Sequence, residues 1–221
     1  MGSYVEVKNV SKSFGDRVIL QNVSLSVEQG TTVGLIGTNG SGKSVLFKII
    51  CGFEKPDQGR GYVRSRRLGK KGRDFPVNMG VFINSPGFIG IYSGFQNLKF
   101  LADIQGKIGE KGIRQAMSKV GLDPDNKTKV DNYSLGMKQK LGIAQAIMEG
   151  QDILILDEPT AGQDIRGIRL LENILKELTA KGKTIVTITH DMEFVVNNFN
   201  KVFVMAHKNL LKITNPKEVF S

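Results

Sequence analysis

The sequence predicts an α/β protein built on a largely parallel β-sheet. Toward the C-terminus, short apolar runs at 153–156, 184–188 and 201–205 alternate with helical patterns. Such alternation is typical of parallel strands joined by crossover helices. Residues 93–148 instead show helical periods throughout, whereas residues 5–27 alternate apolar and polar side chains like strands. We therefore expect an α/β core with an N-terminal antiparallel β-subdomain and an inserted helical subdomain.

The N-terminal strands are predicted from alternation on both sides of a turn. Val5, Val7 and Val10 alternate with polar residues, the turn sequence SFGD follows, and the alternation resumes over 18–27. Two such strands joined by a short turn pair in antiparallel fashion. The next strand is expected at 32–36, where a short apolar run leads into a glycine-rich loop.

The helical segment is expected to present two apolar faces. Leu98, Leu101 and Ile104 are assigned to one face. A second face is expected from Ile113, Ala116, Met117 and Val120. The whole chain, 1–221, then reads as a single domain, with a core at about 1–84 and 150–221 and a helical subdomain at about 88–149.

Composition narrows the class of protein. The 221 residues carry a formal net charge of +10, which suits nucleic acid, an anionic membrane face or polyanionic nucleotides. Cys51, the single cysteine, lies among apolar residues, so a disulfide framework is excluded and a buried thiol in a reducing cytoplasm is expected. No apolar run reaches the roughly 18 residues of a spanning helix, and the start MGSYVEVKNV has no signal-peptide core. At a membrane, another chain would have to anchor this one.

Positive charge is concentrated at 60–73, where RGYVRSRRLGKKGR contains no acidic residue. The stretch contains one aromatic residue, Tyr62, whereas a surface that binds single-stranded nucleic acid has several aromatics, interleaved with basic residues, on which the bases stack. We expect a solvated hairpin and loop that makes at most an electrostatic contact with an anionic surface. No sequence-specific nucleic acid is expected as a partner.

The strongest local motif is GTNGSGKS at 37–44, which fits the phosphate-loop pattern GxxxxGK[ST] between a buried strand and a helix. Its glycines let backbone N–H groups face a polyphosphate, Lys43 reaches the β- and γ-phosphates, and Ser44 offers a hydroxyl to Mg²⁺. The motif predicts a P-loop NTPase (RecA-like) core. The residues expected to contact nucleotide here are Gly37, Thr38, Asn39, Gly40, Ser41, Gly42, Lys43 and Ser44.

A second group of polar residues follows the apolar strands. Asp157 and Glu158 come directly after ILIL, and ligands of open α/β sheets bind at that end of the strands. Asp157 is expected to hold Mg²⁺, whereas Glu158, on the opposite side of the strand end, would act as general base for an attacking water. His190 ends the run TIVTITH, where it is either a γ-phosphate contact or a structural histidine.

Taken together, these motifs resemble, in order and over essentially the whole chain, the nucleotide-binding domain of ABC ATPases. Phe14 in KSFGDRVIL is similar to the aromatic that stacks on adenine, although packing within the β-subdomain is the alternative. The segment YSLGMKQK resembles the family's signature motif, in which Ser134 and Gly136 keep the family's positions while Leu135 and Met137 depart from it. Ser134 would also cap the helix that follows.

Two further positions are assigned through this resemblance. Asp164 in TAGQD matches the aspartate of the loop that meets the partner subunit, although Gln163 replaces the usual leucine. Asn84 stands where the family uses a glutamine to meet Mg²⁺ and the attacking water. Its shorter side chain implies a water-bridged contact that tightens on closure, and the alternative is a turn residue bonded to its own loop.

The resemblance implies a concrete function. ATP and Mg²⁺ would bind, two copies or a homologous pair would close head-to-tail on ATP, and hydrolysis would drive a separate integral-membrane permease from the cytoplasmic face of the membrane. The sequences SPGF and SGFQNL are similar to those of the bacitracin, lantibiotic and multidrug exporter-type branch, which implies export of drugs or antimicrobial peptides.

Two other functions compete with this one. A soluble ABC ATPase acting on ribosomes or nucleic acid would suit the basic charge, but such proteins carry two domains, a coiled coil or zinc-binding inserts. A P-loop kinase or GTPase would account for Lys43 and Asp157 but not for the signature-like segment or His190.

Overall fold

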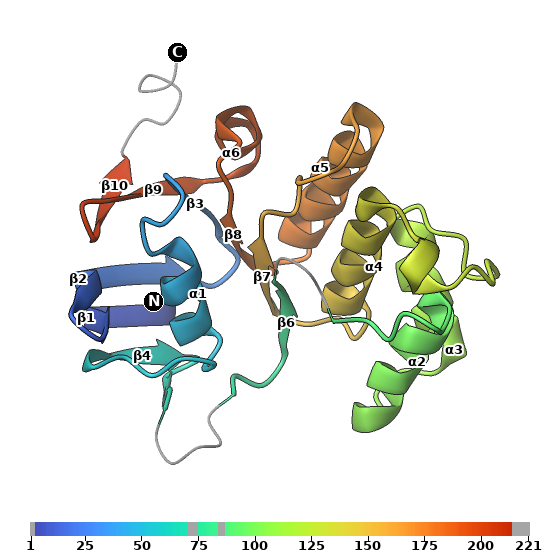
Figure 1. The fold of residues 1–221 in the computed structure, drawn as a ribbon, viewed down its shortest axis with the longest axis horizontal. Helices are drawn as coiled ribbons and strands as arrows, with labels where there is room; N and C mark the ends of the chain where they lie inside the picture. Colours follow the sequence, from blue (N-terminus) through green and yellow to red (C-terminus); the bar gives the residue numbers. More distant parts are fainter. Residues whose placement is uncertain (1–2, 70–74, 84–86, 214–221) are drawn as a thin grey trace.

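In the computed structural model, which describes residues 3–69, 75–83 and 87–213, the centre of the molecule is a six-stranded sheet (Figure 1). The strand order is β10-β9-β3-β8-β7-β6, and all neighbours pair in parallel except the edge pair β9 and β10. The strands are β3 (Thr32–Gly37), β6 (Met79–Phe82), β7 (Ile153–Asp157), β8 (Thr184–Ile188), β9 (Lys201–Ala206) and β10 (Asn209–Ile213).

A second sheet of four strands forms the N-terminal β-subdomain, in the order β2-β1-β4-β5 with every pair antiparallel. Its strands are β1 (Ser3–Phe14), β2 (Arg17–Glu28), β4 (Gln58–Val63) and β5 (Arg66–Arg67). The alternating Val5, Val7 and Val10 are buried, so period-two patterning selected the inner face.

Helix α1 (Lys43–Ile50) lies between the two sheets (Figure 1). Its apolar residues share one core with the β1 valines and one face of the central sheet, represented by Ile153 and Ile155 of β7. Leu154 and Leu156 of the same strand belong to the other core. The strand is buried on both faces, which is why it reads as a continuous apolar run.

The helices between β6 and β7 form the second lobe: α2 (Gly94–Gln105), α3 (Glu110–Lys119), a short 3-10 turn at Val130–Asn132, and α4 (Leu135–Ile147). The assigned residues of α3 are buried as predicted, but the face assigned to α2 is wrong. Leu98 is buried, whereas Ile104 is 78% exposed. Six residues at about 100° each rotate a side chain by roughly 240°, so these two cannot share a face.

The remaining helices, α5 (Ile165–Ala180) and α6 (Met192–Asn198), connect β7 to β8 and β8 to β9. The α/β class with an antiparallel β-subdomain and a helical insertion is confirmed. One short strand was not predicted: β10 at the sheet edge. Among the described residues, no helix combines the length and apolar character that a membrane span requires.

Gly80 marks the closest approach between the central sheet and the helical lobe. A Cβ at this β6 position would lie 1.9 Å from the carbonyl oxygen of Ala146 in α4. We expect Gly80→Ala to lower the free energy of unfolding by roughly 1–3 kcal/mol, because β6 and α4 would have to separate. Urea denaturation measures this change.

Gly109→Ala is the matched control, because no atom of the described residues lies within 4 Å of a Cβ at that position. Equal urea midpoints for the two variants would contradict the close packing of β6 on α4.

Candidate nucleotide-binding and catalytic site

The glycine-rich loop after β3 adopts a backbone that other residues would not tolerate. Gly37 has φ 155°, and a Cβ there would lie 2.5 Å from the carbonyl oxygen of Met205. Gly42 has φ 106°, and its Cβ would press on Leu20 at 2.9 Å. The loop therefore follows a tight path that brings backbone groups, rather than side chains, to its inner side.

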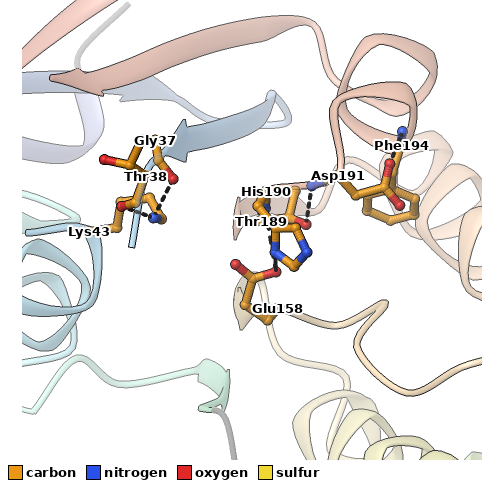
Figure 2. A network of polar contacts seen from close by, with 8 residues as sticks. All are labelled: Gly37, Thr38, Lys43, Glu158, Thr189, His190, Asp191 and Phe194. Atoms are coloured by element: carbon orange, nitrogen blue, oxygen red, sulfur yellow. Dashed lines mark hydrogen bonds and ion pairs between the residues drawn. The ribbon is translucent and has the colours of Figure 1, made fainter. Parts of the chain in front are cut away.

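Lys43 opens helix α1 and folds back over this loop. Its ammonium donates to the carbonyl oxygens of Gly37 at 2.6 Å and Thr38 at 2.9 Å, as Figure 2 shows. The side chain is only 6% exposed. Burial lowers the pKa of Lys43, and the nearby carboxylates of Glu158 and Asp157 oppose that shift.

The N-terminus of α1 is uncapped by any side chain, since Gly42 occupies the cap position. The first-turn N–H groups and the positive end of the helix dipole therefore remain available to an anion. Ser44 is exposed one residue into the helix, and Lys48 lies one turn further along the same cavity wall.

Asp157 ends β7 with its carboxylate nearly buried, at 6% exposure. Burial raises its pKa to about 6, helped by the neighbouring Glu158 and opposed by Lys43 and Lys48. A carboxylate held in this way is costly to keep ionised unless a cation joins it.

Glu158 departs from the strand conformation, with φ 50°. A non-glycine residue in the left-handed region is uncommon and is found preferentially at functional sites. This turn breaks the strand alternation, so the expectation that Asp157 and Glu158 lie on opposite sides is wrong: both line the same cavity.

His190 follows β8 and faces Glu158 directly (Figure 2). Its Nδ1 lies 2.9 Å from Oε2 of Glu158, while the imidazole is 72% exposed. An ionised carboxylate only accepts hydrogen bonds, so Nδ1 carries the proton in this contact. The imidazole thereby orients the Glu158 carboxylate and leaves Nε2 toward solvent.

Lys43, Ser44, Asp157 and Glu158 line one cavity of about 520 Å³, whereas His190 contacts Glu158 without bordering it. The cavity is lined by Arg17, Ile19, Asn39–Val45, Lys48, Ile83, Asp157, Glu158 and Ile188. A neighbouring cavity of about 760 Å³ is lined by loop residues 37–41, of which 39–41 border both cavities, and by His207 and Lys208. Together they form a basic, glycine-rich surface suited to a polyphosphate with an attached nucleoside.

Several of these lining residues were missed at the level of sequence. Lys48 could have been found, because it is four residues after Ser44 on the same helix. Arg17 follows the β1–β2 turn, and His207 and Lys208 come from the β9–β10 hairpin. No local pattern connects those segments to the phosphate loop.

The site also fits Mg²⁺. The Asp157 carboxylate and the Ser44 hydroxyl line one cavity and are hard oxygen donors, which this ion prefers. Among the described residues there is no cluster of three or more metal-ligating side chains. One carboxylate and one hydroxyl match an ion that takes its other ligands from phosphate and water.

The signature-like residues lie elsewhere. Ser134 caps α4, its hydroxyl accepting from the Met137 N–H at 3.2 Å. Gly136 approaches the carbonyl oxygen of Gly162, 3.1 Å from where its Cβ would be. Leu135 presses on Gly162, and of the described residues that line the two phosphate-loop cavities, none comes from 134–136.

The remaining predicted residues take three different positions. Asp164 caps α5, its carboxylate accepting from the Gly167 N–H at 2.7 Å. Phe14 is 50% exposed, and the Lys12 ammonium lies 5.0 Å from its ring centroid. Phe14 does not border either cavity of the described chain, although Asp16 in the same turn does. Asn84 lies outside the described residues.

A phosphate loop on one strand of a parallel sheet, with paired acids on the next strand but one, defines a P-loop nucleoside triphosphatase. Comparison with known proteins identifies the family. The ABC transporter family model matches residues 20–161. An uncharacterised ABC transporter ATP-binding protein of Bacillus subtilis is 37% identical, covering 93% of this chain and 94% of that protein.

A bacitracin transport ATP-binding protein of Enterococcus faecalis is 32% identical, covering 97% of this chain and 70% of that protein. Among solved structures, a Clostridium perfringens subunit that is part of an ABC transporter complex, cbiONQ, superposes with a TM-score of 0.82 at 27% identity, covering 100% of this chain and 91% of that one. The chain belongs to the ABC transporter family, as an ATP-binding protein whose activity is the hydrolysis of ATP.

Removing the buried charge of Asp157 should stabilise the nucleotide-free protein. The pKa of Asp157 in the folded protein is about 6, above the ordinary value of 3.8. Above pH 6 the ionised carboxylate therefore destabilises the fold. This destabilisation is lost as the pH falls from about 6 to below 3.8, where the carboxyl is protonated in both the folded and the unfolded protein. We expect Asp157→Asn to raise the free energy of unfolding near neutral pH by on the order of 2 kcal/mol.

Thermal unfolding over a pH series measures this gain, which should shrink as the pH falls below about 6. Asp103→Asn, at an exposed position, is the control and should change stability by less than about 0.5 kcal/mol. A destabilised Asp157→Asn protein at neutral pH would show that the carboxylate is not strained in this way.

Proposed function

We propose that this chain binds ATP with Mg²⁺, closes head-to-tail on a second copy of itself or a homologous subunit, and powers a separate integral-membrane permease from the cytoplasmic face. The observation that carries this proposal is the separation of Ser134 and Gly136 from the cavities at the phosphate loop. One copy supplies the loop and the acids but leaves the signature-like helix end unused.

Within one subunit, the nucleotide roles follow the arrangement of the cavity. Residues 37–44 surround the phosphates, with Lys43 exchanging its two backbone carbonyls for phosphate oxygens. Ser44 and Asp157 hold Mg²⁺, which neutralises phosphate charge when bound. Two further roles rest on the family resemblance and not on the cavity. Phe14 would stack on the adenine after its ring leaves the Lys12 ammonium, and Asn84 would meet the ion and the attacking water through a bridging water until closure tightens the contact.

The second subunit completes the site. Ser134 and Gly136 stand at the N-terminus of α4, where the helix dipole and free N–H groups favour a γ-phosphate. Asp164 stands at the start of α5, next to the Gly162 segment on which Leu135 packs. The two elements therefore move together when subunits close on ATP, and phosphate release would let them part.

Hydrolysis needs one base and one positioned water. Glu158 takes a proton from water as its oxygen attacks the γ-phosphorus, and the bond to the bridging oxygen of ADP breaks. His190 holds the carboxylate through Nδ1. For His190 to donate a hydrogen bond to the γ-phosphate, either Nε2 must carry a proton or the exposed ring must rotate. The negative charge of the phosphate would favour both changes.

The permease contact is proposed at the junction of core and helical lobe. A groove of about 340 Å³ is bordered by Phe53, Phe82, Phe88 and Leu101 among others. Beside it, Ile89 is 50% and Ile91 61% exposed. Exposed apolar side chains of this kind, grouped at a groove, suit an amphipathic helix of a membrane subunit.

Buried Asn97 makes this surface rigid. Its side chain accepts from the Ile89 N–H at 2.7 Å and donates to the carbonyl oxygens of Ile89 and Ser93, at 3.1 and 3.0 Å. The loop that presents Ile89 and Ile91 is thus fixed before any partner binds. Export of drugs or antimicrobial peptides is the transport direction we propose, on the likeness to the bacitracin transport ATP-binding protein.

Glu158→Gln separates ATP binding from hydrolysis. The amide keeps the shape of the side chain but cannot take a proton, so we expect turnover to fall by roughly 10²–10⁴ while ATP still binds. Size-exclusion chromatography with ATP should show an accumulated dimer. Parental ATPase activity in this variant would remove Glu158 from the role of base.

Copurification distinguishes the transporter from the soluble alternative. An affinity-tagged chain, expressed in its native cells, should recover a membrane subunit from detergent extracts. Ile89→Asp combined with Ile91→Asp should reduce recovery strongly, and Lys176→Asp at an exposed position of α5 should not. Cosedimentation with ribosomes, without recovery of any membrane subunit, would favour the soluble function.

A further inference from the structure

A second charged cavity lies on the β-subdomain, apart from the phosphate loop. Its volume is about 420 Å³, within the range of ligand pockets. It is lined by Val63, Arg64, Arg66, Arg67, Leu68, Phe75, Pro76 and Val77, and we call it the arginine cavity. The ATPase cycle proposed above uses none of these residues.

The hairpin of β4 and β5 builds the basic wall. Arg64 and Ser65 form its two-residue turn with φ 50° and 63°, the left-handed values that tight hairpins require. The Arg64 guanidinium is fixed by the Tyr4 ring, 5.5 Å from its centroid, and by the Asp152 carboxylate at 3.5 Å. The turn is therefore held in place against the β-subdomain and the start of β7.

Arg66 and Arg67 differ from Arg64 in their exposure and in their ion pairing among the described residues. Both are exposed on β5, and neither takes part in an ion pair within the described ranges. The acid nearest this wall in the ion-pair network, Asp152, already accepts from Lys183 at 3.0 Å as well as contacting Arg64. Guanidinium groups are planar and always charged, and two of them with no ion-pair partner among the described residues suit a phosphate.

The opposite wall is apolar and open to solvent. Phe75 is 60% and Val77 56% exposed, and they lie together on this wall of the cavity. The Phe75 ring lies 5.6 Å from that of Phe53, itself 52% exposed. Phe53 also borders the groove proposed for the permease, so the two surfaces are continuous.

We propose that the arginine cavity binds the phosphate of an anionic phospholipid, with Phe75 and Val77 resting on the apolar part of the lipid. Guanidinium groups facing exposed apolar side chains fit an amphipathic anion better than a fully hydrated one. The proposal rests on the proposed function, since a subunit docked on a permease holds this cavity near the bilayer. Continuity through Phe53 favours lipid over nucleic acid.

The test uses the purified chain and sedimentation with vesicles of phosphatidylcholine, with and without phosphatidylglycerol. Binding should require phosphatidylglycerol, and Arg66→Ala combined with Arg67→Ala should weaken it by roughly tenfold. Lys127→Ala combined with Lys129→Ala removes the same charge from exposed positions on the helical lobe and should weaken it much less. Phe75→Ser should reduce binding while leaving the net charge unchanged.

Several outcomes would overturn the proposal. Equal losses in the arginine and lysine pairs would reduce the effect to net charge. Displacement of the chain from vesicles by inorganic phosphate at matched phosphate concentration would identify a site for free anions. Arginine-dependent binding to duplex RNA or DNA that persists at moderate salt, without vesicle binding, would assign the cavity to nucleic acid.

The assay contains neither ATP nor permease, so its failure is separate from failure of the proposed function. The arginine variant should keep parental ATPase activity and recover the membrane subunit as the parent does. Loss of ATPase activity in that variant would mean that the substitution disturbs the fold.

Discussion

Three neighbouring parallel strands end at one edge of the central sheet, and the rest of the molecule depends on that convergence. The strand β3 delivers the phosphate loop, β8 beside it delivers His190, and β7 delivers Asp157 and Glu158. Hydrogen-bonded register aligns the strand ends, since Ile188 of β8 pairs with both Leu35 and Asp157. The phosphate loop, Asp157 and Glu158 are thereby brought around one cavity, and His190 contacts Glu158.

Without a ligand, the buried charges at this edge of the sheet are only partly compensated. Burial lowers the pKa of Lys43 and raises that of Asp157, so the charged form of each side chain is less stable in this site than in water. A polyphosphate with Mg²⁺ would stabilise both charged forms, because it brings anionic oxygens to Lys43 and a cation to Asp157. Differential affinity for such a ligand is what allows nucleotide to shift a protein between conformations.

The sequence alone predicted the parts of this site that are local. The phosphate loop, the paired acids and the helix cap at Ser134 depend on neighbouring residues, and short patterns specify them. What could not be predicted depends on distant segments. The edge strand β10 and the contribution of His207 to the nucleotide side are examples, because no periodicity in those residues reports what they pair with.

Two other features were predicted only in part. Glu158 leaves the strand through a left-handed backbone, so alternation did not predict the direction of its side chain. The basic stretch 60–73 was expected to be a solvated hairpin and loop, and its described part does form the β4–β5 hairpin. Its apolar opposite wall, however, comes from Phe75 and Val77, which only the fold brings close.

The central claim is that one copy cannot complete a catalytic site, and mixing two inactive variants tests it most directly. Lys43→Ala removes the phosphate-loop cation, and Ser134→Asp keeps the cap of α4 while placing a negative charge toward the γ-phosphate of the partner's site. A mixed dimer would contain one intact composite site. ATPase activity should therefore reappear on mixing, and a mixture as inactive as its components would contradict the account.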